Sequence, residues 1–174
     1  MLSKDSREIF QDYMPNNICF GCGKNTKNGL HIKSYWVDNF SECVWTPKNI
    51  HQGWPGIMNG GIIATIIDCH VMGTSMAYAY KHENRPLGSL PEYKYATGSM
   101  KIKYLKPTPN QTVLLRAKVL SYSEKKVYIS CKVISKKTVT AIGEVIAFRV
   151  YDSSKKEKNP VSYTHLTLPT KRIV

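Results

Sequence analysis

One stretch of the chain, residues 51–80, holds the groups best suited to chemistry. It contains one carboxylate, Asp68, inside an apolar run that opens with Gly60 and Gly61 directly after Asn59. A carboxylate can act as a general base or as a nucleophile. Glycine lets a ligand approach the backbone closely, and free N–H groups at a helix start bind an anion or a polarised carbonyl. These features favour a site for a carbonyl compound.

A long helix must hold these groups. Asn59 is a favourable N-cap, because its side-chain oxygen can accept hydrogen bonds from the free N–H groups of the first turn. We expect the helix to run from there to about Tyr80, with Asp68 buried or lining a cleft. A buried acid with a purely structural hydrogen bond is the alternative. Small residues and the acid form a stripe at helical spacing that suits close packing against a sheet or a partner: Gly61, Ala64, Thr65, Asp68, Ser75 and Ala79.

The spacing of Gly60 and Asp68 argues for two subunits. Eight residues correspond to two turns, or roughly 12 Å along a helix. One helix therefore cannot easily place both groups on the same carbonyl. Two antiparallel helices in a dimer can, with Gly60 of each chain facing the partner's Asp68, and a two-fold dimer would form two such sites.

The remaining chain predicts an α+β fold with an antiparallel sheet. Asp38-Asn39 is a plausible hairpin turn between the first two strands. Residues 4–13 are expected to form a short helix, and residues 82–91 are rich in turn formers. Strands are expected at 30–37 and 40–46 before the long helix, and at 93–105, 113–122, 126–135 and 139–151 after it.

A length of 174 residues suggests one domain. We divide the chain into an N-terminal segment (1–15), the folded domain (16–152) and a C-terminal tail (153–174). Residues 161–174 have no partner element and look like translated vector sequence, so we exclude them from the fold.

Charge and composition limit the function classes. The net charge is +13, from 25 basic and 12 acidic residues, which favours a polyanionic partner such as a nucleic acid or a CoA ester. The basic residues are scattered and no nucleic-acid motif is present, so we expect no nucleic acid partner. Residues 62–80 approach the length of a membrane span, but Asp68, Cys69 and His70 lie inside them, so we expect none.

The five cysteines are Cys19, Cys22, Cys43, Cys69 and Cys131. An odd, scattered set without a secretory signal favours reduced thiols in the cytoplasm. Cys19 and Cys22 form a CxxC, but zinc needs about four ligands and no second CxxC or paired histidine follows at a matching spacing. A subunit interface could supply more ligands. We expect a glycine-rich loop with small buried thiols, and neither a metal nor a cofactor.

At this point the chain resembles the hotdog-fold acyl-CoA thioesterases of the PaaI-like group, over roughly residues 16–151. That resemblance implies a curved antiparallel sheet around one long central helix, an acyl-CoA substrate and a homodimer or dimer of dimers. The matching segments are Cys19-Phe20-Gly21-Cys22, Gly29-Leu30, His51-Gln52-Gly53-Trp54-Pro55-Gly56-Ile57, Gly60-Gly61-Ile62-Ile63-Ala64-Thr65, Asp68 and Tyr104-Leu105-Lys106-Pro107.

The resemblance implies roles for particular residues. Gly60 would polarise the carbonyl through its N–H, and Asp68 would be the base or the nucleophile. Counting back from residues 104–107 places Thr97 where related enzymes hold the attacking water with a Ser or Thr, and Gly98 can mark a bulge that re-aims it. Asn59 stands where the family usually has histidine, and an amide cannot carry a proton near neutral pH.

Other polar residues receive weaker assignments. We expect Asn59, Gly61, His51 and Gln52 to bind substrate, although a loop histidine more often makes local hydrogen bonds. His70 points away from Asp68 and is expected to be structural. The chain is thus predicted to hydrolyse acyl-CoA thioesters. A non-catalytic acyl-CoA or lipid-binding hotdog protein is the alternative, and no clearly placed Asp/Glu–His pair supports a hotdog dehydratase.

Overall fold

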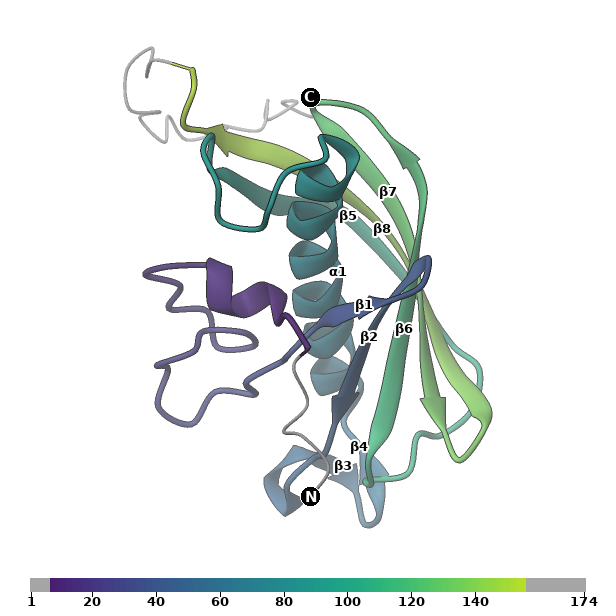
Figure 1. Cartoon of the computed structure of the whole chain (residues 1–174). Coiled ribbons are helices and arrows are strands. Elements are labelled where there is room, and N and C mark those ends of the chain that lie inside the picture. Colours follow the sequence, from purple (N-terminus) through teal and green to yellow (C-terminus); the bar gives the residue numbers. More distant parts are fainter. Residues whose placement is uncertain (1–6, 156–174) are drawn as a thin grey trace, which may run out of the picture.

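A computed structural model describes residues 7–155. One long helix, α1 (Gly60–His82), lies in the concave face of a curved six-stranded antiparallel sheet (Figure 1). The strands follow the order β1-β2-β6-β7-β8-β5, so β5 forms one edge. Their bounds are β1 Tyr35–Val37, β2 Phe40–Trp45, β5 Tyr93–Tyr104, β6 Val113–Tyr122, β7 Lys126–Ser135 and β8 Thr138–Asp152. The predicted hotdog fold is confirmed.

The sheet forms because its central strands alternate apolar and polar residues, which places every second side chain against the helix. In β7, the inward side chains Val127, Ile129, Cys131 and Val133 are all fully buried. The predicted turn at Asp38 is confirmed, and its backbone adopts a positive φ of 52°. The register of the core strands therefore follows from their sequence pattern.

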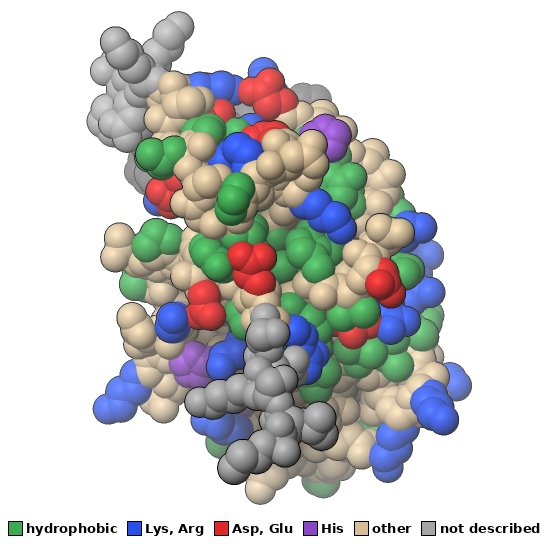
Figure 2. Space-filling model, in the orientation of Figure 1, with side chains coloured by type: hydrophobic (Ala, Val, Ile, Leu, Met, Phe, Trp, Pro, Cys, Tyr) green, Lys and Arg blue, Asp and Glu red, His purple; other side chains and the backbone are tan. Residues whose placement is uncertain are grey.

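The helix is buried by the sheet on one side and by the N-terminal segment on the other (Figure 1). In the described part of the chain, α1 is the one helix that is long and apolar enough to cross a membrane. However, 67% of its most apolar window is buried inside the protein, as in the core helix of a globular domain. Figure 2 shows Lys and Arg side chains on several parts of one face, with acidic side chains among them.

Three predictions about local structure need correction. Instead of the expected helix at 4–13, the structure has a short 3-10 helix, η1 (Phe10–Tyr13). Residues 1–6 of the predicted N-terminal segment and residues 156–174 of the predicted tail lie outside the described range. The first strand begins only at Tyr35. The loop before α1 contains a 3-10 turn, η2 (Asn49–His51), and a small hairpin of β3 (Gln52–Trp54) and β4 (Ile57–Met58). These strands are too short to show an alternating pattern.

His70 is fully buried at the centre of a chain of polar side chains and is structural, as predicted. Its Nδ1 lies 2.8 Å from Ser34 Oγ, and its Nε2 lies 3.3 Å from Ser41 Oγ. Gln11 continues the chain by donating to Ser34 Oγ at 3.0 Å, which links η1 to α1. Burial lowers the pKa of His70 from its ordinary 6.5 to about 4, although a hydrogen bond that the ring donates to the Ser41 backbone opposes the shift.

Acidification is expected to destabilise the protein through His70. The unfolded chain binds this proton below pH 6.5 and the folded chain only near pH 4, so stability is lost as the pH falls between these values. The free energy of unfolding falls by about 3 kcal/mol between the neutral and the acid end of that pH range. Urea unfolding at a series of pH values measures it, with His70→Gln as the comparison that lacks this contribution. An NMR titration that finds His70 protonating near pH 6.5 in the folded protein contradicts the assignment.

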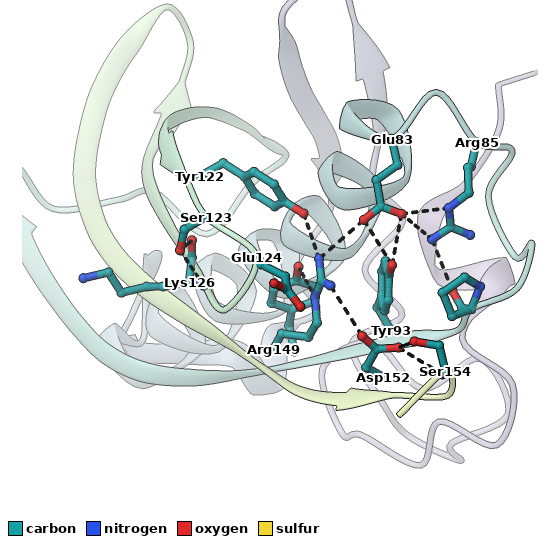
Figure 3. A network of polar contacts seen from close by, with 12 residues as sticks. Glu83, Arg85, Tyr93, Tyr122, Ser123, Glu124, Lys126, Arg149, Asp152 and Ser154 are labelled. Carbon is teal, nitrogen blue, oxygen red and sulfur yellow. Dashed lines mark hydrogen bonds and ion pairs between the residues drawn. The ribbon is translucent and has the colours of Figure 1, made fainter. Parts of the chain in front are cut away.

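A second network ties the C-terminal end of α1 to the sheet (Figure 3). The Arg149 side chain of β8 is only 5% exposed and donates to Tyr122 Oη at 2.7 Å and Tyr95 Oη at 3.2 Å. Its guanidinium lies 3.8 Å from the centre of the Tyr93 ring and 3.7 Å from a carboxylate oxygen of Glu83. A buried cation needs such partners. The network fixes where α1 ends relative to β5 and β8.

Candidate active site

The start of α1 offers one free backbone donor. Asn59 caps the helix as predicted, because its Oδ1 accepts from the N–H of Gly61 at 2.7 Å and of Ile62 at 3.3 Å. The Ile63 N–H donates to the Asn59 carbonyl at 3.1 Å. Among residues 7–155, the Gly60 N–H has no hydrogen-bond acceptor, and Gly60 is exposed. The helix dipole adds positive potential at this point. The Gly60 N–H can therefore bind a ligand's oxygen.

Tyr104 lies beside this donor. Its hydroxyl donates to the Gly60 carbonyl at 2.9 Å, and its ring would lie 3.6 Å from a Cβ added at Gly60. Tyr104 belongs to a segment that carried the family resemblance, but nothing in its residue type or spacing indicated a role. Its position at the end of β5 next to the helix start was not visible from local pattern. Tyr104 fixes the Gly60 peptide against the sheet.

Asp68 and Thr97 meet within one chain. The Thr97 hydroxyl donates a hydrogen bond to Asp68 Oδ1. Asp68 is half-buried on α1 and Thr97 lies on the exposed edge strand β5. The pairing of β5 with β8 shifts register between Thr97 and Ser99, so the predicted bulge at Gly98 is present. The bulge turns the Thr97 side chain toward the helix.

A cavity of about 290 Å³ lies beside Asp68. Its wall is formed mainly by apolar and thiol side chains from α1, β5 and the N-terminal segment. Sequence reasoning missed this cavity, because its walls come from segments far apart in the chain. Its lining includes Tyr13, Met14, Cys19, Cys22, Asp68, Cys69, Met72, Met76 and Tyr95.

The structure keeps the two halves of the predicted site apart. Gly60 and Asp68 lie on one continuous helix, two turns from each other. Neither Gly60 nor Gly61 lines the cavity beside Asp68. The Gly61 N–H is occupied by Asn59 and is not a free donor. A single chain thus presents an oxygen-binding donor at one place and a carboxylate at another.

His51 and Gln52 support the loop before α1. The His51 side chain is buried, stacks on Trp45 and accepts at Nδ1 from the Lys48 N–H at 2.9 Å. Burial, with the nearby Lys48 charge, lowers the pKa of His51. Gln52 accepts from the Gly56 N–H and donates to the Asn49 carbonyl. Both side chains use their polar atoms within the loop, and neither lines the cavity.

Cys69 joins the CxxC loop at the cavity wall. Cys22 and Cys69 are buried, whereas Cys19 is exposed, so only part of the predicted burial of the loop thiols is observed. All five cysteines are free. Hydrogen bonds to its sulfur, chiefly from Cys69, lower the pKa of Cys22 to about 6. The same pairing, together with burial, raises the pKa of Cys69. The Cys22 thiol therefore loses its proton more readily than the Cys69 thiol.

Both a protein-family model and a solved structure relate the chain to the thioesterase superfamily. The model of the thioesterase superfamily matches residues 55–142. No protein with a curated description matches the chain. A thioesterase superfamily protein from Shewanella loihica is 29% identical, with 67% of this chain and 88% of that chain covered and a TM-score of 0.54.

Two other solved structures share the fold at lower identity. The PaaI protein of the Escherichia coli phenylacetic acid degradation operon is 12% identical, with a TM-score of 0.58. The match covers 71% of this chain and 82% of that one. A thioesterase from Haemophilus influenzae is 9% identical, with 78% and 84% covered and a TM-score of 0.59.

Proposed function

The chain belongs to the thioesterase superfamily, and from this premise we propose that it hydrolyses the thioester bond of an acyl-CoA. The observation that carries the proposal is the combination of a free N–H on Gly60 with the hydrogen-bonded pair of Asp68 and Thr97. Thioester hydrolysis needs a donor for the carbonyl oxygen and a base for the attacking water. The chain supplies one of each.

The proposed reaction uses these groups in fixed roles. The thioester carbonyl oxygen accepts from the Gly60 N–H, which stabilises the negative charge that develops there. Asp68 takes a proton from a water molecule that attacks the carbonyl carbon. Thr97 engages Oδ1 of the carboxylate and leaves Oδ2, which has no hydrogen bond within residues 7–155, for the water. The carbon–sulfur bond then breaks, and the CoA thiolate leaves and takes up a proton.

We propose that the site is shared between two chains. The separation of Gly60 and Asp68 on one helix favours a two-fold arrangement in which each carbonyl contacts Gly60 of one chain and the partner's Asp68. Within residues 7–155, the outer edge of β5 has no neighbouring strand, and most residues of β5 are exposed. A second copy would cover this edge and the adjacent helix start. We therefore propose a homodimer, alone or paired into a dimer of dimers.

In the proposed complex the acyl group occupies the cavity beside Asp68. Its volume of about 290 Å³ is at the small end of ligand pockets and suits a short or aromatic acyl group. The exposed lysines of β5, Lys101 and Lys103, and the positive net charge favour binding of the CoA phosphates.

A second candidate function is acyl-CoA binding without turnover. It is favoured by Asn59, whose side-chain oxygen is fully engaged in capping the helix and whose amide cannot carry a proton. Both functions predict that the protein binds CoA esters. Only the enzyme predicts release of the thiol.

The test is a panel of acyl-CoAs that spans short, long and aromatic acyl groups, with a thiol reagent as readout. We expect turnover of at least one member, with preference for small acyl groups. Binding of the same esters is measured in parallel by calorimetry. Binding without any thiol release selects the second candidate, and neither binding nor release removes both.

A further inference from the structure

Three cysteine thiols from two distant segments converge at the cavity wall. Cys19 and Cys22 lie in the loop between η1 and β1, and Cys69 lies in the middle of α1. All three Sγ atoms lie within 4.8 Å of one another, and those of Cys19 and Cys69 are 3.6 Å apart. Within residues 7–155, this is the one group of three or more His, Cys, Asp or Glu ligands placed so closely.

The backbone of the loop that contains Cys19 and Cys22 lies in close contact with α1 at Gly21. A Cβ added at Gly21 would lie 2.1 Å from Cys69 Sγ and 3.1 Å from Thr65 Cγ2, so any side chain there would push the loop away. The Gly23 N–H donates to the Cys19 carbonyl at 2.7 Å and closes the turn. Glycine at position 21 is therefore what brings the two loop thiols onto Cys69.

Two of the sulfurs also accept hydrogen bonds from N–H donors. The Gly21 N–H donates to Cys19 Sγ at 3.3 Å, and the Asn17 side-chain amide donates to Cys22 Sγ at 3.2 Å. Such donors stabilise the thiolate form, which is the form that binds metal. The loop thus positions both sulfurs beside N–H donors, and the donor from Asn17 favours the thiolate form of Cys22.

From this geometry we propose that Cys19, Cys22 and Cys69 bind a Zn²⁺ ion. Zinc bonds to thiolate sulfur at about 2.3 Å, so a tetrahedral site holds its sulfurs about 3.8 Å apart, close to the spacing of this cluster. Binding displaces the thiol protons into solvent. Three protein ligands leave the fourth position for an oxygen, which water supplies.

The ion would join the N-terminal loop to α1 next to Asp68. A disulfide would consume two of the thiols and leave the third, whereas a soft metal ion uses all three. The site would fix one wall of the cavity that contains Asp68. The proposal does not depend on which reaction Asp68 carries out.

The test measures zinc in protein purified under reducing conditions with added Zn²⁺ and then dialysed. We expect about one ion per chain by elemental analysis. Substitution with Co²⁺ should give a thiolate charge-transfer band and the intense visible bands of a tetrahedral site. Cys22→Ala and Cys69→Ala should each weaken zinc binding by more than the roughly 100-fold that loss of a supporting group costs. Cys19→Ala should weaken zinc binding to the same extent. Because Cys19 is exposed, we expect this substitution to leave the fold intact.

Matched controls separate ligation from general damage. Cys43→Ala removes a fully buried thiol outside the cluster and should keep the full zinc content. Asp68→Asn should also keep it, since water is the fourth ligand, so the metal readout is independent of thioesterase activity. Circular dichroism checks folding of every variant. The proposal is overturned when the reduced wild type holds no more zinc than folded Cys19→Ala, or when Cys43→Ala loses as much zinc as the cluster variants.

Discussion

Replacing Asp68 by asparagine is expected to lower kcat for acyl-CoA hydrolysis by about 10²–10⁴-fold, the usual contribution of a general base. The amide keeps the shape of the side chain and still accepts the Thr97 hydrogen bond at its oxygen. It cannot take a proton from water at neutral pH. We therefore expect KM and thermal stability to change little while the chemical step slows.

Steady-state kinetics with the best substrate of the panel measures this effect. Asp38→Asn is the matched control, because it makes the same chemical change in the hairpin between β1 and β2, where a positive φ suits asparagine. Thr97→Val should give a smaller loss, since it removes only the partner of Asp68. An Asp68→Asn protein with activity equal to Asp38→Asn rules out the proposed role of the carboxylate.

Replacing Gly60 by proline is expected to lower kcat by about 10²–10³-fold, the cost of losing one oxyanion donor. Proline has no N–H, and it is well tolerated at the first position of a helix. The Asn59 backbone already has φ −63° and ψ 135°, which a following proline accepts. The change thus removes the N–H, adds the carbons of the proline ring and is compatible with an intact helix.

Gly60→Ala is the control for the added side-chain atoms. It keeps the N–H, and its Cβ would meet Tyr104 at an ordinary contact distance of 3.6 Å. We expect Gly60→Ala to keep most of the activity. Equal losses in the alanine and proline variants, measured by the same assay, would mean that crowding rather than the N–H matters.

Mixing the two inactive variants tests whether the site is shared. In a mixed dimer of Gly60→Pro and Asp68→Asn chains, a shared arrangement leaves one site with both defects and one site intact. Co-expression should then restore up to half of the wild-type activity per mixed dimer. Sites contained within one chain would stay inactive in every combination, which would contradict the shared site.

The main elements of the fold were predictable because their sequences are locally consistent. The spacing of small and apolar residues indicated α1, and Asn59 indicated its start. Alternation gave β6 and β7 with their observed bounds. The hairpin of β3 and β4 was missed, since strands of three and two residues carry no periodic signal.

The site was only partly predictable. Gly60 and Asp68 could be singled out because glycine and an isolated carboxylate are conspicuous in an apolar helix. Cys69 could not be joined to the CxxC, because this contact is set by how the N-terminal loop lies across α1. Tyr104 and the cavity depend in the same way on tertiary packing. His51 and Gln52 were expected to bind substrate, but their polar atoms serve the loop.

The bulge at Gly98 changes which residues of β5 lie on the face that contacts α1. Thr97 and Tyr104 both reach α1 from this strand, yet they are seven residues apart, and strict alternation sends residues an odd number apart to opposite faces. The one extra residue at the bulge makes both contacts possible. A strand of the same length without the bulge would turn either Thr97 or Tyr104 away from α1. Removing the bulged residue itself would bring the two positions to an even separation, which regular alternation places on one face.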